Sequence, residues 1–124
     1  MIVYKGVAFS DWSVKHDISD EMLTSAVNEM NSGAYEANLG GSVYKKRIAI
    51  GNKGKSAGVR TVLAFLVNEK AFFIYGFAKS KLDNIDDKEL KALKKLAKIY
   101  LHLTETELSK AAQERKLIKV GLYE

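Results

Sequence analysis

The chain of 124 residues has no cysteine and no proline, and it has no apolar run long enough to form a membrane-spanning helix. Without cysteine, a disulfide-stapled scaffold, a zinc ribbon and thiol chemistry are excluded. A helix that crosses a bilayer needs about 20 apolar residues, and the first residues lack the basic and then apolar pattern of an export signal. We therefore expect a cytoplasmic protein with no metal, no other cofactor and no membrane partner.

The composition is that of one compact domain over residues 1–124. Hydrophobic residues make up 47% of the chain and charged residues 28%, which is enough apolar material for a core and is not typical of a disordered chain. No internal repeat or linker divides the sequence.

The net charge of +5 is distributed unevenly. Residues 1–36 carry two basic and six acidic side chains, residues 37–68 carry six basic and no acidic ones, and residues 69–124 carry twelve basic and nine acidic ones. Six cations without an acid are costly to gather unless an anion compensates them, and phosphate is the common partner. A solvated lysine-rich surface is the alternative interpretation of such a run.

Two helices are expected in the first third of the chain. Residues 6–16 form a weak helix candidate. A clearer one follows Ser19, which is suited to an N-cap, and it ends at Ser32-Gly33. Its apolar positions recur at helical spacing: Leu23, Ala26, Val27 and Met30.

Three strands are expected next, at Val43–Ile50, Val59–Val67 and Ala71–Ala78, where β-branched and aromatic residues dominate. The last two are joined by Asn68-Glu69-Lys70 and predict a hairpin. Short links favour an antiparallel meander, and its nearly continuous apolar character indicates that helices cover at least one face.

Two further helices are predicted from capping-box spacing, one at Asp86 and Glu89 and one at Thr104 and Glu107 that runs towards Lys116. The tail from Leu117 to Glu124 is either a short strand or a segment ordered by a partner. The chain is thus an α+β fold, with a small antiparallel sheet flanked by N-terminal and C-terminal helices.

The segment Gly51–Gly58 is rich in glycine and lysine. Gly54-Lys55-Ser56 suggests a P-loop, but that motif needs a glycine where Ala49 stands, and it must lead into a helix rather than a strand. The segment is better suited to holding a phosphate backbone against the main chain, with Lys53 and Lys55 neutralising its charge.

Arg60 begins the next predicted strand, so its guanidinium is held by a sheet and can grip a phosphate in bidentate geometry. A salt bridge to an acid on a neighbouring helix is the alternative for this residue. Lys79 and Lys81 follow the third strand and extend the same basic surface if the strands are neighbours. His16 and His102 are far apart in sequence and are not expected to act as bases.

Four stretches of the sequence resemble those of a known protein family. They are Lys46-Arg47-Ile48-Ala49, Gly54–Thr61, Ala71–Lys79 and Asn84-Ile85. Together they are similar to the RelE/HigB group of bacterial type II toxin–antitoxin toxins, within the RelE/ParE superfamily, over roughly residues 1–120. The resemblance implies the microbial RNase-like toxin fold.

It further implies ribosome-dependent, metal-independent cleavage of mRNA, in which the RNA 2′-hydroxyl attacks the adjacent phosphorus. By resemblance, the catalytic residues are Arg60, Lys55 and Lys79, and the RNA-binding residues are Lys45, Lys46, Arg47, Lys53 and Lys81. Some relatives have a tyrosine or histidine near the position of Ile85, and Ile85 can replace neither. The general base therefore stays unassigned.

The resemblance also implies two partners, mRNA on the ribosome and a cognate antitoxin, usually one with a helix-turn-helix domain. Two alternatives stay open, because a fold does not determine a function. One is a gyrase inhibitor similar to the ParE group, against which the cluster of Lys53, Lys55 and Arg60 argues. The other is a basic nucleic-acid-binding module without catalysis.

Overall fold

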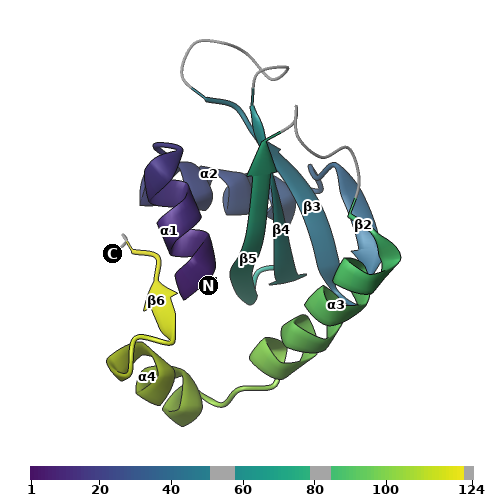
Figure 1. Ribbon diagram of the computed structural model, residues 1–124. Coiled ribbons are helices and arrows are strands. Elements are labelled where there is room, and N and C mark those ends of the chain that lie inside the picture. Colours follow the sequence, from purple (N-terminus) through teal and green to yellow (C-terminus); the bar gives the residue numbers. More distant parts are fainter. Residues whose placement is uncertain (51–57, 79–84, 122–124) are drawn as a thin grey trace.

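The computed structural model describes residues 1–50, 58–78 and 85–121. Figure 1 shows a central sheet with helices around it. The elements in chain order are β1 (Ile2–Gly6), α1 (Val7–Lys15), α2 (Asp20–Asn31), β2 (Ala37–Gly40), β3 (Val43–Ile48), β4 (Val59–Leu66), β5 (Lys70–Ala78), α3 (Asp87–Leu101), α4 (Glu105–Gln113) and β6 (Leu117–Lys119). The α+β class predicted from the sequence is confirmed.

The sheet is mixed, which corrects the prediction of a wholly antiparallel one. Its strand order is β2-β3-β4-β5-β1-β6. The predicted meander is confirmed, since β3, β4 and β5 pair antiparallel, but β1 pairs parallel to β5. A parallel neighbour requires a long crossover, and the chain from α1 to β4 supplies it. The sequence prediction missed β1 because its five residues are too few to show a period.

The hairpin of β4 and β5 is the centre of the sheet and was predicted. Asn68 has a φ of 59°, which asparagine tolerates better than most residues. The register shifts once, between Val62 and Leu63, so that one residue of β5 is left over in the pairing. The bulge changes which side chains of β5 face each side of the sheet.

The helix caps agree with their predicted positions. Ser19 Oγ accepts a hydrogen bond from Met22 N at 3.2 Å. Thr104 and Glu107 form both halves of a capping box. At α3 the Asp86 carboxylate accepts a hydrogen bond from Glu89 N at 2.7 Å. The predicted cap is confirmed there, with this one bond in place of the two of a capping box. The last helix ends at Gln113, short of the predicted Lys116.

Both faces of the sheet are covered. Phe9 of α1 and Leu23 of α2 pack with Phe73 in one hydrophobic cluster, and Ala97 of α3 packs with Val62 and other residues in a second one on the opposite face. The predicted tail forms β6, which pairs with β1, and residues 122–124 lie outside the described part. None of the described helices is both long and apolar enough to cross a membrane.

Candidate nucleic-acid interface

Two rows of side chains cross the sheet on the face that α3 covers in part. The register places Arg47 opposite Arg60 and Arg60 opposite Phe77. The next row on that face contains Lys45, Val62 and Tyr75. Directly opposed residues share a face, so three cations and two aromatic rings lie together. We call this set the basic aromatic patch: Lys45, Arg47, Arg60, Tyr75 and Phe77.

Arg60 is largely covered, with 12% of its side chain exposed. Its Nε lies 2.9 Å from Oε1 and 3.2 Å from Oε2 of Glu36. Arg60 therefore forms the salt bridge given above as the alternative, although its partner Glu36 lies between α2 and β2 and not on a helix. Arg60 Nη1 is buried and has no hydrogen-bond partner among the described residues. The Nε edge of the guanidinium is thus fixed by Glu36, while the Nη1 donor has no acceptor among the described residues.

Electrostatic repulsion between Arg47 and Arg60 has to be offset. Like charges directly opposite on neighbouring strands destabilise a sheet, and Glu36 is the acid that pairs with Arg60 among the described residues. A polar donor that is buried without a partner adds a cost of its own. A phosphate at this position would remove both costs, because its oxygens accept charge-assisted hydrogen bonds from guanidinium groups.

Lys46 lies on the other face of the sheet, although the sequence groups it with Lys45 and Arg47. Its Nζ is 2.6 Å from Glu29 Oε1 on α2, and 9% of its side chain is exposed. Strand alternation separates consecutive residues in this way. Of the RNA-binding residues predicted in this strand, Lys45 and Arg47 are placed beside Arg60 and Lys46 is not.

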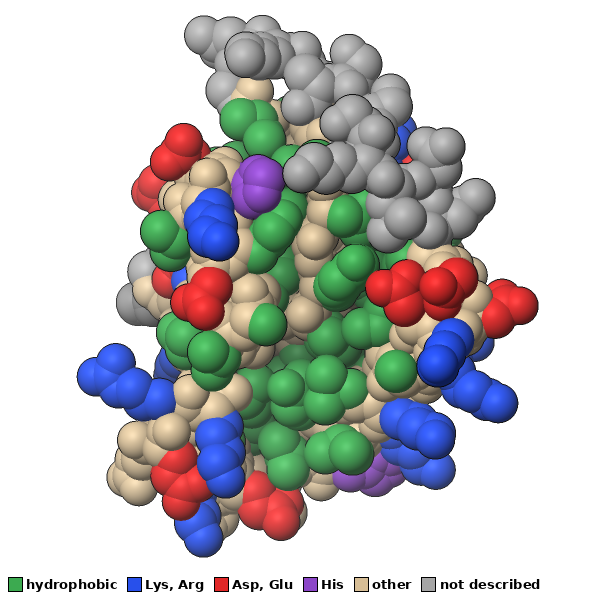
Figure 2. All heavy atoms as spheres, in the orientation of Figure 1, with side chains coloured by type: hydrophobic (Ala, Val, Ile, Leu, Met, Phe, Trp, Pro, Cys, Tyr) green, Lys and Arg blue, Asp and Glu red, His purple; other side chains and the backbone are tan. Residues whose placement is uncertain are grey.

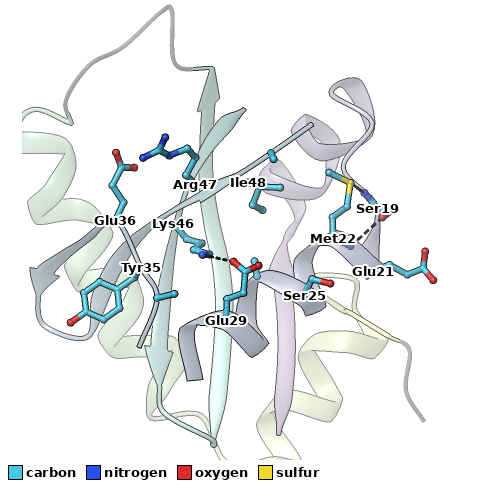
Figure 3. Close-up of a pocket in the computed structure, with 13 residues that line it drawn as sticks. Ser19, Glu21, Met22, Ser25, Glu29, Tyr35, Glu36, Lys46, Arg47 and Ile48 are labelled. Carbon is cyan, nitrogen blue, oxygen red and sulfur yellow. Dashed lines mark hydrogen bonds and ion pairs between the residues drawn. The ribbon is translucent and has the colours of Figure 1, made fainter. Parts of the chain in front are cut away.

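A pocket of about 480 Å³ lies on this other side, between α2 and β3. Figure 3 shows Lys46 turned towards Glu29, while Arg47 and Glu36 lie farther from α2. Its lining includes three carboxylates, from Glu21, Glu29 and Glu36, but only two cations, Lys46 and Arg47. Glu29 is paired with Lys46, and Glu36 is paired with Arg60, so the lining has no excess of positive charge that would favour a phosphate ligand.

Four predicted site residues, Lys53, Lys55, Lys79 and Lys81, lie outside the described residues. The strands that lead to them end near the basic aromatic patch. Ile48 pairs with Val59, and Val59 pairs with Ala78, so the last described residues on either side share one end of the sheet.

The patch borders the N-terminus of α3 at Tyr75. Burial raises the pKa of the Tyr75 phenol, and the negative charges of the Glu89 and Asp86 carboxylates raise it further. The phenol is therefore protonated at neutral pH. Ile85 is half-buried in the hydrophobic cluster beneath α3. Sequence reasoning missed the contacts of Glu36 and Glu89, because Glu36 had no local signal and Glu89 was noted only for its cap spacing.

The histidines lie away from the patch. The His16 ring packs against Trp12 at a tilt of 36°, with ring centroids 4.7 Å apart, and His102 Nδ1 is 2.7 Å from the Lys98 carbonyl oxygen. Within residues 1–50, 58–78 and 85–121, no three His, Asp or Glu side chains are close enough together to hold a metal ion.

Comparison with known families assigns the chain. The model of the RelE toxin of the RelE/RelB toxin–antitoxin system matches residues 1–120. No curated protein matches the chain. The matched region contains every described element of the sheet and all four described helices. The chain therefore belongs to the RelE toxin family, and its role is that of the toxin in a toxin–antitoxin system.

Proposed function

We propose that this toxin is an endoribonuclease that cleaves mRNA on the ribosome. The observation that carries the proposal is the state of Arg60. A guanidinium held by β4 and Glu36 has a buried Nη1 without a partner among the described residues, and it lies beside Arg47 and two aromatic rings. Cations that bind phosphates and rings that stack on bases are the usual parts of a surface for single-stranded RNA.

The reaction we propose forms a bond between the RNA 2′-oxygen and the adjacent phosphorus. The bond from phosphorus to the 5′-oxygen then breaks, which leaves a 2′,3′-cyclic phosphate and a 5′-hydroxyl. One proton leaves the 2′-hydroxyl and one reaches the 5′-oxygen. Negative charge grows on the phosphorane oxygens, and a fixed donor at this position lowers the barrier because it needs no reorganisation. Arg60 is proposed as that donor.

The remaining predicted residues complete the proposal. Lys53 and Lys55 position the backbone, with Lys55 near the reacting phosphate, and Lys79 and Lys81 supply charge or a proton after β5. Lys45 and Arg47 bind neighbouring phosphates from β3. Lys46 is left out of this set, because its ammonium group pairs with Glu29 on the opposite face.

Tyr75 is proposed to stack on a base of the RNA, with Phe77, which is only 6% exposed, packed beside it. Their ring centroids lie 5.8 Å apart on the face that carries Arg60. The raised pKa of Tyr75 makes its phenol a donor and not a base at neutral pH. The group that removes the proton from the 2′-hydroxyl is therefore not Tyr75, and Ile85 has no titratable group.

A cognate antitoxin, with a helix-turn-helix domain by resemblance, is proposed to neutralise the toxin by covering the basic aromatic patch. Acidic side chains on the covering segment would complement Lys45 and Arg47. Because the proposed target is mRNA on ribosomes, we expect the free toxin to act in the cytoplasm.

The proposal is tested by expressing the chain without its antitoxin and mapping the 5′ ends of cellular mRNA. We expect growth arrest and new cuts inside translated regions for the wild-type chain. Arg60→Lys keeps the charge but loses the planar fork, so we expect the cuts to be lost. Arg115→Lys is the matched control, because Arg115 is exposed and lies beyond α4.

Three other results would contradict parts of the proposal. Growth arrest with intact mRNA would favour a gyrase inhibitor, and unhindered growth of the wild-type chain would favour a binding module without catalysis. Unchanged cuts in Arg60→Lys would remove Arg60 from its proposed role.

A further inference from the structure

The outer edge of β3 is only partly covered. β2 pairs with β3 no farther than Lys45, whose carbonyl oxygen accepts a hydrogen bond from Glu36 N at 2.8 Å. The next backbone groups that point to this side are those of Arg47, because Phe65 N donates to Ser42 O and the two sides of β3 alternate from there. No strand pairs with this end of the edge in the described part of the chain. An open strand edge is a template for pairing with another chain.

The pocket of about 480 Å³ between α2 and β3 adjoins the open edge. Tyr35 lines it from the segment before β2 and is 43% exposed. Its ring makes an edge-on contact with Tyr44, with ring centroids 4.9 Å apart. On the α2 side the lining includes the small residues Ser25 and Ala26. An exposed aromatic ring thus stands beside a hollow, on a surface that we call the pocket face: Glu21, Ser25, Tyr35, Arg47 and the open edge of β3.

The charges of the pocket face are complementary to those of a second copy. The other three charged residues of the pocket lining are engaged in the ion pairs described above. Glu21 and Arg47 form no ion pair in the part of the chain that the structure describes. Figure 3 shows them on opposite sides of the pocket. A twofold axis between two copies would bring each Arg47 to the Glu21 of the other copy.

The composition of the pocket face favours a protein partner over nucleic acid. Helix α2 carries three acids and no base, whereas basic side chains stand along α3 on the face that Figure 2 shows. Acids beside the pocket repel a phosphate backbone. Tyrosine and arginine are enriched in protein–protein interfaces and supply many of their strongest contacts. Because ring, hollow and both charges lie on one surface, that surface can pair with itself.

We propose that two copies of this chain associate through the pocket face about a twofold axis. Arg47 of each copy pairs with Glu21 of the other, and each Tyr35 ring enters the hollow of the other copy. The open edges of β3 meet in the same contact. The dimer takes up Arg47, which also belongs to the basic aromatic patch, so it is a resting form that competes with RNA. That last consequence rests on the proposed function, and the association itself does not.

The test measures the mass of the purified full-length chain by sedimentation equilibrium over a series of concentrations. The variants are Glu21→Arg, Arg47→Glu and the double variant that exchanges both charges. Glu105→Arg is the matched control, because Glu105 is exposed in the first turn of α4 as Glu21 is in that of α2. Circular dichroism verifies that every variant folds.

We expect a wild-type dimer with a dissociation constant in the micromolar range. Each single variant brings like charges together at two symmetric places, so we expect its dissociation constant to rise at least about tenfold. The double variant restores both pairs with reversed polarity and should dimerise again. Tyr35→Ala should also weaken the dimer, since it leaves both hollows empty. Glu105→Arg should dimerise like the wild-type chain.

Several results would overturn the inference. A wild-type chain that stays monomeric well above micromolar concentration would reject the dimer. A dimer that both single variants leave unchanged, or that the double variant does not restore, would reject the pocket face as its contact. A monomeric wild-type chain whose binding to the antitoxin is lost in Glu21→Arg would assign the face to the antitoxin and reject the second copy.

Competition with RNA is measured by adding a 2′-O-methyl RNA oligonucleotide, which resists cleavage, to the wild-type dimer. We expect the dimer to dissociate into complexes of one chain with RNA. A dimer that binds this RNA with an unchanged dissociation constant would overturn its assignment as a resting form. Sedimentation does not depend on cleavage, so intact mRNA in cells would reject only the proposed function, whereas a monomer would reject only the dimer.

Discussion

Arg60 is held along one edge of its guanidinium by Glu36, and its buried Nη1 has no hydrogen-bond partner among the described residues. Its place at the start of a strand follows from the apolar run after it, and β4 confirms that place. Its partner Glu36 lies 24 residues away in sequence, in a segment with no pattern of its own. This contact is tertiary, so no local sequence pattern predicts that Glu36 occupies one edge of the guanidinium.

Gly76 permits the close packing of Trp12 on β5. A Cβ at this position would overlap the indole ring. We expect Gly76→Ala to lower the free energy of unfolding by about 1–3 kcal/mol, because overpacking forces the ring or the strand to move. Urea denaturation measures the change. Gly121→Ala is the control, since nothing lies within 4 Å of a Cβ there, and an unaffected Gly76→Ala would show that Trp12 is not confined.

Glu89 influences the titration of Tyr75. Because its carboxylate raises the pKa of the phenol, we expect Glu89→Gln to shift Tyr75 ionisation to lower pH. Phenolate absorbance measures the shift, as the difference between each protein and its Tyr75→Phe version. Glu105→Gln, on the exposed start of α4, should leave it unchanged. An unshifted titration in Glu89→Gln would contradict the contact.

The same raised pKa has a consequence for stability. Above pH 10 the unfolded chain releases the Tyr75 proton more readily than the folded chain, since the folded pKa is the higher one. Folding stability should therefore fall as the pH rises above 10, and the fall should be smaller in Tyr75→Phe. Urea denaturation at pH 8 and at higher pH compares the two proteins, and an equal fall in both would contradict the prediction.

At the scale of elements, local sequence patterns predict the helix caps, whereas no local pattern predicts which short strands pair. The caps at Ser19 and Thr104 are local, because both partners lie within four residues. The short strands β1 and β6 have no such signal, since each is stabilised by strands that are distant in sequence. β2 pairs with the adjacent β3, but its four residues are too few to show a period. The tail was predicted as one of two alternatives, and its pairing with β1 selects the strand.

The N-cap of α3 is a side-chain bond from Glu89 N to Asp86. We expect Asp86→Ala to lower the free energy of unfolding by about 1 kcal/mol, because the Glu89 N–H loses its acceptor. Asp87→Ala is a matched control, since Asp87 is exposed in the first turn and does not form the cap. Urea denaturation compares both with the wild-type chain, and equal losses would show that the cap bond contributes little.

At the scale of the whole molecule, the basic side chains of residues 37–68 that the structure describes lie on both faces of the sheet. The sequence shows six cations between residues 37 and 68 as one cluster. Strand alternation sends Lys46 to the α2 side, where Glu29 neutralises it, and leaves Lys45, Arg47 and Arg60 on the α3 side. The composition predicts a phosphate-binding surface, and the register places three of its described cations on one face, whereas Lys53 and Lys55 lie outside the described residues.

We propose that the toxin cuts mRNA through the RNA 2′-hydroxyl, with Arg60 as the charge-stabilising group. The most direct measurement follows cleavage by the purified chain on translating ribosomes. It uses two mRNAs that differ only in a single 2′-deoxy nucleotide at the mapped cut site. We expect cleavage of the all-ribose mRNA, an intact deoxy mRNA that still binds, and at least about a 100-fold slower cut with Arg60→Lys, as for loss of a transition-state donor. Equal cleavage of both mRNAs would contradict attack by the 2′-hydroxyl, and an undiminished rate with Arg60→Lys would contradict the proposed role of Arg60.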